Sequence, residues 1–171
     1  MKDDYEIAQD LARHLLLSSF VCDIGWFGGN PTIRFSSDNA PSEIWLSMPG
    51  GFEVIPSPVL PEVLSPRQRD LLLLESIHGY EVSAVQCHPD SRLQVLFANG
   101  TSLLALDNDD DLHECWELRT ERGDLIVACH GGGFAVLAVE HHDDLMRMGG
   151  QAGSMTVAAR LVSTPVDDLS M

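Results

Sequence analysis

Residues 93–106 read LQVLFANGTSLLAL, and this stretch indicates most clearly what kind of fold the chain forms. Its Asn99-Gly100 pair lies between two apolar runs that are typical of strands. Asn-Gly accepts the positive φ angles of a type I′ turn, whose twist matches that of two antiparallel strands. The stretch therefore predicts a β-hairpin with strands over 93–98 and 101–106.

Similar strand and turn patterns continue on both sides of this hairpin. Toward the C-terminus, a second hairpin is expected around Glu121-Arg122-Gly123, with strands over 114–120 and 124–129, and a further strand over 134–139. Toward the N-terminus, strands are expected over 20–27, 32–35, 43–47, 52–55 and 80–87, with a loop over 36–42. Short strands separated by turn residues at this spacing predict antiparallel meanders.

Two segments have helical rather than strand patterns. A first helix is expected to run to about Leu17, with Asp3 or Asp4 as its cap and one apolar stripe formed by Ala8, Leu11, Ala12, Leu15 and Leu16. Ser65-Pro66 is a second helix start, because serine caps a helix well and proline suits its first position. Gly79 is expected to end that helix. The sequence thus predicts an α+β fold with two helices packed on antiparallel β-meanders.

The prolines suggest how the chain is divided. Of its nine prolines, Pro56, Pro58, Pro61 and Pro66 fall within residues 56–66, which we interpret as a linker. This predicts an N-terminal unit over 1–55, a helix plus β-hairpins, and a C-terminal unit over 67–140, a helix plus a β-meander. Residues 141–171 contain several glycines and form a tail whose structure the sequence leaves open.

The two units share a pattern that permits an internal duplication. Each has a helix with a leucine run, and each has a strand that combines Glu with Trp before a Gly-Gly turn. These strands hold Glu43-Ile44-Trp45 in the first unit and Glu114-Cys115-Trp116 in the second. Two copies of a pattern do not establish a repeat, so a duplication and a pair of ordinary α+β modules both remain open.

The charge of the chain limits the classes of partner. Its 26 acidic and 10 basic residues give a formal net charge of −16. Nucleic acids and anionic membranes both attract Lys and Arg, so neither is expected as a partner. A basic protein would be attracted by this charge, which would also keep the chain soluble. An acidic N-terminus and the absence of an apolar run of about 20 residues predict a cytoplasmic protein.

Cysteine and histidine residues suggest metal binding only weakly. We expect Cys22, Cys87, Cys115 and Cys129 to be reduced and buried, because each lies in an apolar, strand-like segment. His113 and Cys115 share a strand face, and Cys87-His88 and Cys129-His130 are further pairs. Adjacent strand residues point to opposite faces, however, and no Cys-x-x-Cys motif is present. We therefore predict no metal, no cofactor and no catalytic residues.

Two other patterns have simple structural interpretations. The acidic run over 107–111 lacks the glycine and the glutamate of a calcium loop, where Leu112 and Leu118 stand instead. We interpret it as a solvated loop. Trp26, Trp45 and Trp116 are expected in the core, whereas a tryptophan exposed beside Glu43 or Glu117 would mark an interface.

The second unit also carries a recognisable order of motifs. It consists of the Asn99-Gly100 turn, an acidic loop, Glu114, Trp116-Glu117-Leu118, a Gly123-Asp124 hairpin and the glycines 131–133. In this order, residues 93–137 resemble a bacterial domain of unknown function that is common in actinobacteria as short single-domain proteins. Such proteins are similar to immunity proteins, which bind and block a toxin from the same locus. The resemblance implies binding and no catalytic residues.

Together these observations predict a non-catalytic protein-binding module, an immunity-type inhibitor that neutralises a basic toxin or enzyme. Its carboxylates would occupy a cationic cleft of the partner, and the expected contact residues are Asp107, Asp109, Asp110, Asp111, Glu114 and Glu117. One alternative is a structural module that forms a homodimer or larger homo-oligomer through open sheet edges. Another is a small metal-dependent enzyme that uses Cys and His.

Overall fold

A computed structural model describes residues 3–37, 40–107 and 114–138 of the chain. Among these it contains two helices, α1 (Asp4–Leu16) and α2 (Pro66–Glu75), and ten strands in two antiparallel sheets. The first sheet has the order β1 (Phe20–Phe27), β2 (Asn30–Ser37), β3 (Ala40–Ser47), β8 (Glu114–Thr120), β9 (Leu125–Cys129) and β10 (Gly133–Leu137). The second has the order β4 (Phe52–Ile55), β7 (Ser102–Ala105), β6 (Leu93–Phe97) and β5 (Val82–Cys87). The predicted α+β fold is confirmed.

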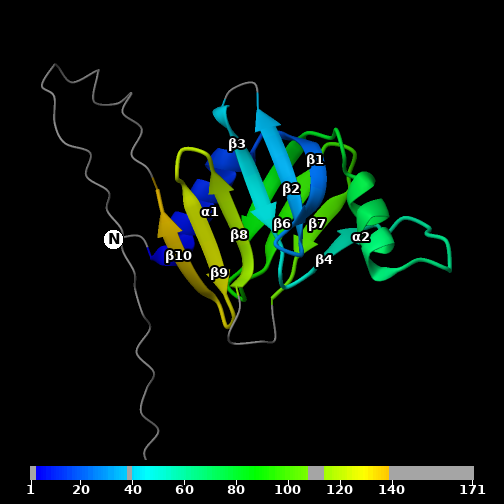
Figure 1. Ribbon diagram of the computed structural model, residues 1–171. Coiled ribbons are helices and arrows are strands. Elements are labelled where there is room, and N and C mark those ends of the chain that lie inside the picture. The colour runs from blue at the N-terminus through cyan, green and yellow to red at the C-terminus, as the bar shows by residue number, and fades with distance from the viewer. Residues whose placement is uncertain (1–2, 38–39, 108–113, 139–171) are drawn as a thin grey trace, which may run out of the picture.

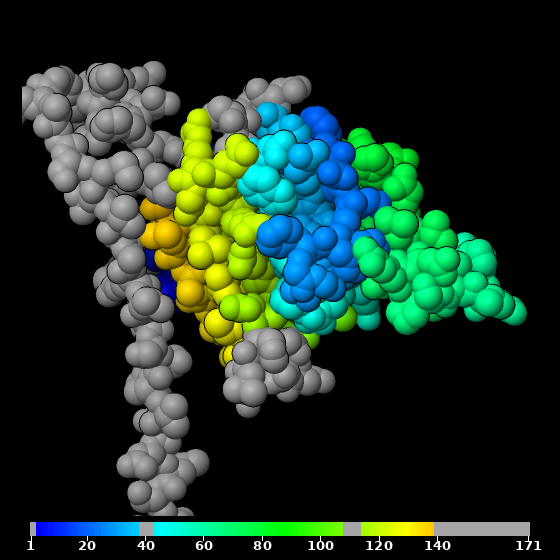
Figure 2. Space-filling view, in the orientation of Figure 1, coloured from blue at the N-terminus to red at the C-terminus, as the bar shows by residue number. Residues whose placement is uncertain are grey.

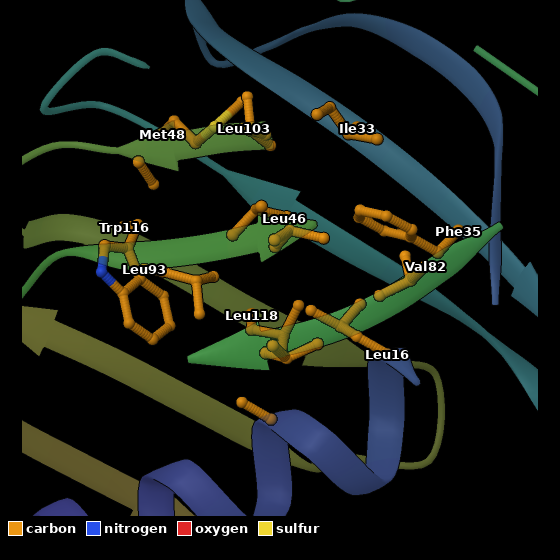
Figure 3. Packing of buried hydrophobic residues seen from close by; sticks show 14 of the residues in the cluster. Leu16, Ile33, Phe35, Leu46, Met48, Val82, Leu93, Leu103, Trp116 and Leu118 are labelled. Atoms are coloured by element: carbon orange, nitrogen blue, oxygen red, sulfur yellow. The ribbon is translucent and has the colours of Figure 1, made fainter. Parts of the chain in front are cut away.

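The elements form two layers (Figure 1). The six-stranded sheet is one layer, and the four-stranded sheet and α1 lie together on its inner face. Helix α1 packs against β5 and β10, while α2 lies at the opposite end beside β1 and β4. Figure 3 shows the core between the layers, to which Leu46 and Trp116 contribute from the first sheet, Leu93 from the second and Leu16 from α1. The outer face of the six-stranded sheet is left uncovered by the other described elements.

Local signals in the sequence account for the ends of most elements. Asn99-Gly100 joins β6 to β7, and Gly100 has a φ of 82°. Ser65 and Gln68 form the capping box at the start of α2, although this helix ends at Glu75, before Gly79. The loop expected over 36–42 was wrong, because β2 and β3 continue as a hairpin in which Ser37 pairs with Ala40. Strands pair through their backbone groups, so a weak local strand propensity does not prevent this pairing.

Both sheets take strands from both sides of the proline-rich segment. Strand β3 pairs with β8, so that Leu46 lies opposite Leu118, and β4 pairs with β7, so that Val54 lies opposite Leu103. The two parts of the chain are therefore interleaved within one structure. Trp45 and Trp116, which occupy matching places in the pattern that the two units share, point to opposite faces: Trp116 is fully buried and Trp45 is half-buried.

Helix α1 closes one side of the core. Asp3 caps it by accepting a hydrogen bond from the Glu6 amide at 2.8 Å, and its apolar stripe buries Ala8, Ala12, Leu15 and Leu16. Neither helix in the described part of the chain is long and apolar enough to cross a membrane.

Candidate functional site

The uncovered face of the six-stranded sheet presents an unusual row of side chains. In β2 and β3, Ile33, Phe35, Ile44 and Leu46 point inward and are fully buried. Because side chains alternate along a strand, the residues between them point outward. Cross-strand register then places Arg34 opposite Trp45, and Trp45 opposite Arg119. An indole therefore lies between two guanidinium groups on the outer face.

Phe27 at the end of β1 joins this row. Its side chain is 65% exposed. The Arg119 guanidinium carbon lies 5.0 Å from the centroid of the Phe27 ring and 5.8 Å from that of Trp45. A cation within about 6 Å of a ring face is attracted by the ring quadrupole. We refer to Phe27, Arg34, Trp45 and Arg119 as the outer-face cluster.

Carboxylates hold both arginines of this cluster. Arg34 makes ion pairs with Glu43 at 3.1 Å and with Asp23 at 3.3 Å. Glu43 is the main cause that raises the pKa of Arg34. Arg119 Nε lies 3.7 Å from a carboxylate oxygen of Glu117. The guanidinium groups are thereby oriented, and three carboxylates surround two cations, so the face has no excess of positive charge.

A shallow hollow adjoins the cluster. It has a volume of about 180 Å³ and is lined by Asp23, Ile24, Gly25, Trp26, Phe27, Thr32, Arg34 and Trp45. Pockets for drug-sized ligands measure roughly 300–1,000 Å³. The hollow is therefore too small for such a ligand, but it can accept one or two side chains of another protein. Figure 2 views the molecule from this side, with β1 to β3 in blue and cyan and β8 and β9 in yellow tones.

Trp26 is among the residues that line the hollow, but it lies between Gly25 and Phe27 on β1, so its side chain points to the opposite face of the sheet from Phe27, toward α2. It is half-buried, and the Arg67 guanidinium carbon of α2 lies 4.7 Å from the centroid of its ring. The core position expected for all three tryptophans is thus confirmed for Trp116 alone. Trp45 is instead half-buried on the outer face, on the same strand as Glu43 and one strand away from Glu117.

The expected acidic contact residues are found in two different places. Asp107 lies two residues beyond the end of β7, where its Oδ1 accepts a hydrogen bond from Cys115 Sγ at 3.0 Å and lies 3.2 Å from His130 Nδ1. Glu114 is exposed and pairs across the sheet with Cys129. Glu117 points to the outer face beside Arg119. Asp109, Asp110 and Asp111 lie outside the described residues, as does His113.

The structure brings two of the Cys and His residues together at one carboxylate. Cys115 and His130 both contact Asp107. The described residues include no group of three or more His, Cys, Asp or Glu arranged to hold a metal ion. The four cysteines, all within the described residues, form no disulfide, and burial raises the pKa of Cys87 to about 12. Cys129 is exposed, contrary to expectation, because it ends β9 on the outward-facing side.

Sequence reasoning missed the outer-face cluster, although part of its signal was present. Ile44 and Leu46 flank Trp45, just as Ile33 and Phe35 flank Arg34, and period-two alternation would place both central residues on the outer face. Arg119 could not be added from sequence, because its approach depends on the pairing of β3 with β8.

The motifs behind the resemblance of residues 93–137 each have a place in the fold. Asn99-Gly100 turns β6 into β7, Gly123 lies in the turn between β8 and β9, and Trp116 fills the core. Turns and a buried tryptophan of this kind occur in many antiparallel sheets. No family model, curated protein or solved structure with which the chain was compared matches it.

Proposed function

We propose that this protein is a non-catalytic protein-binding module, an immunity-type inhibitor that binds and blocks a basic toxin or enzyme. The observation that carries the proposal is the outer-face cluster, in which Trp45 and Phe27 flank Arg119 on an uncovered sheet. Tryptophan and arginine are enriched among the residues that contribute most to the affinity of protein interfaces.

The contacts that order the side chains of the outer-face cluster should reduce the conformational entropy lost on binding. Trp45 lies on β3, which is paired on both sides, by β2 and by β8. Arg34 and Arg119 are held by carboxylates and rings. Side chains that are already ordered lose little rotamer freedom on binding. The face therefore presents a largely pre-organised contact surface.

Charge supports a basic partner. The whole chain carries −16. At the cluster itself, Asp23, Glu43 and Glu117 outnumber the two arginines that they contact. Opposite potentials accelerate encounter, and their effect falls as salt is added. The aromatic rings would then contribute most of the affinity, while the carboxylates would select a cationic surface and exclude its substrate.

Capture followed by inhibition tests this proposal. The purified protein, immobilised, should retain a basic protein from a lysate of its source at low salt and release it at high salt. Added back in solution, the protein should abolish the activity of the captured protein at one equivalent. Trp45→Ala should weaken binding at least about tenfold, which corresponds to about 1.4 kcal/mol.

Leu96→Ala is the matched control, because Leu96 is a half-exposed apolar residue on the other sheet. Its binding should equal that of the unchanged protein. Retention that is insensitive to salt, equal loss in both variants, or a captured protein whose activity is unaffected would contradict the proposal.

A further inference from the structure

The segment between β4 and α2, residues 56–65, is a second apolar surface. It projects beyond α2 at the edge of the molecule (Figure 1), and the same protrusion is visible in the space-filling view (Figure 2). Val59 and Val63 are 101% and 93% exposed. Both valine side chains lie in solvent, so neither fills the hollow on the outer face of its own sheet.

The loop is constrained even though it projects. Leu60 packs against the core, and the Ser65–Gln68 capping box fixes its far end. Pro56, Pro58 and Pro61 fix their own φ angles and have no backbone N–H to donate. Proline-rich segments with these properties bind aromatic-lined grooves, because little conformational freedom is lost on docking.

The same chain supplies an aromatic-lined hollow. Phe27 and Trp45 are the outward-facing aromatic residues that line it, and its volume of about 180 Å³ suits side chains rather than a small ligand. We propose that the loop over 56–65 of one copy of this chain docks in the outer-face hollow of a second copy. This inference rests on the same hollow as the proposed function, and self-association would compete with the basic partner for it.

The charge of the chain predicts how salt should change the strength of this contact. Two copies that each carry −16 repel one another, and within the loop itself Glu62 is the single charged residue. Apolar contacts must therefore overcome electrostatic repulsion. Salt screens the repulsion and leaves apolar contact intact, with a Debye length of about 3 Å at 1 M. Self-association should thus strengthen as salt is added, whereas binding of a basic partner weakens.

Sedimentation over a range of protein concentrations tests the inference. The unchanged protein should self-associate at least about tenfold more tightly at 1 M salt than at low salt, a difference of about 1.4 kcal/mol. A loop variant, Val59→Ser with Val63→Ser, and a hollow variant, Phe27→Ser, should each be monomeric when alone. All three substitutions are at strongly exposed positions and keep the net charge. Leu96→Ser, on the other sheet, should associate like the unchanged protein.

Mixing the two defective variants gives the decisive result. The hollow variant keeps its loop and the loop variant keeps its hollow, so an equimolar mixture should form a complex no larger than a dimer. A monomeric unchanged protein at high salt and high concentration, association that survives in either variant alone, or a mixture that stays monomeric would overturn the inference. Association through sheet edges would survive in both variants. Capture of a basic partner at low salt is judged separately, so either proposal can fail while the other stands.

Discussion

The indole Nε1 of Trp116 donates a hydrogen bond to the backbone carbonyl oxygen of Ser91 at 2.5 Å. Trp116 belongs to β8 of the first sheet, and Ser91 lies in the turn between β5 and β6 of the second. Ser91 Oγ also donates to the Cys129 carbonyl and accepts from the Gly132 amide. This turn therefore joins the two sheets through three hydrogen bonds, and Ser91 adopts a φ of 69° to make them.

Trp116→Phe should remove both a hydrogen bond and packing volume. The Ser91 carbonyl would lose its indole donor in a buried setting, which costs about 1–3 kcal/mol, and a residual cavity adds to that cost. We expect the free energy of unfolding to fall by about 2–4 kcal/mol in urea titrations. Trp45→Phe, at a half-exposed site with no indole hydrogen bond among the described contacts, should lose less than about 1 kcal/mol. Equal losses would contradict the assigned role of Trp116.

Gly132→Ala should be much more damaging than Gly131→Ala. Both glycines have positive φ values, 91° and 78°, so alanine is strained at either position. A Cβ on Gly132 would lie 2.2 Å from the backbone oxygen of Pro89, whereas a Cβ on Gly131 meets nothing within 4 Å. We expect Gly131→Ala to cost about 1–2 kcal/mol, and Gly132→Ala to cost at least about 2 kcal/mol more because backbone must move. Thermal unfolding of both variants checks this, and similar melting temperatures would contradict it.

Cys87 should make stability decrease at alkaline pH. Burial raises its pKa from 9.0 to about 12 in the folded protein. Between these values the unfolded chain loses the thiol proton while the folded protein keeps it, so rising pH favours unfolding. The contribution of the neutral thiol is fully present below pH 9 and is lost as pH rises toward 12. The slope reaches at most about 1.4 kcal/mol per pH unit.

The measurement is the free energy of unfolding as a function of pH for the unchanged protein and for Cys87→Ala. The variant should have a shallower decline above pH 9, whatever its stability at neutral pH. Parallel curves would show that Cys87 is not the group responsible. Cys129, which is exposed, should react with a thiol reagent in the folded protein, whereas Cys87 should react only on unfolding.

Local sequence signals predicted much of this fold, for identifiable reasons. Asn99-Gly100, Ser65-Pro66 and the stripe of Ala8 and Leu15 act over a few residues, and each defines the element that it predicts. The pairing of β3 with β8 has no such signal, because it joins segments about seventy residues apart in the sequence. The outer-face cluster depends on that pairing.

The positions of the acidic residues also depend on strand pairing that the local sequence does not predict. Asp107 and Glu117 are ten positions apart in sequence, yet one contacts Cys115 and His130 while the other lies on the outer sheet face beside Arg119. The composition gives the net charge of the chain but not where the carboxylates lie. The register of β8 determines that Glu117 faces outward. Whether either residue contacts a partner remains a prediction.

The side chain of Gln9 forms hydrogen bonds with the backbone of β5, as a neighbouring strand would. Strand β5 lies at the edge of its sheet, and Gln9 Oε1 accepts a hydrogen bond from the Cys87 amide at 2.7 Å, while its Nε2 donates to the Val85 carbonyl at 3.2 Å. An unpaired strand edge is a template for wrong pairing, and here a helix side chain occupies it. Gln9→Met keeps the length of the side chain and removes both bonds. Hydrogen exchange of the Cys87 amide should then accelerate about 10- to 100-fold, as expected for a loss of about 1.4–2.8 kcal/mol.

Gln94→Met is the control, since within the described part of the chain the Gln94 side-chain amide donates to the Ser102 hydroxyl and not to the Cys87 or Val85 backbone. Its Cys87 amide should exchange at the original rate. If Gln9→Met leaves that rate unchanged as well, the amide is protected by burial against α1 rather than by Gln9. The edge of β5 would then be covered by packing alone, and a substitution that disturbs the packing of α1, such as Leu16→Ala, would be needed to expose it.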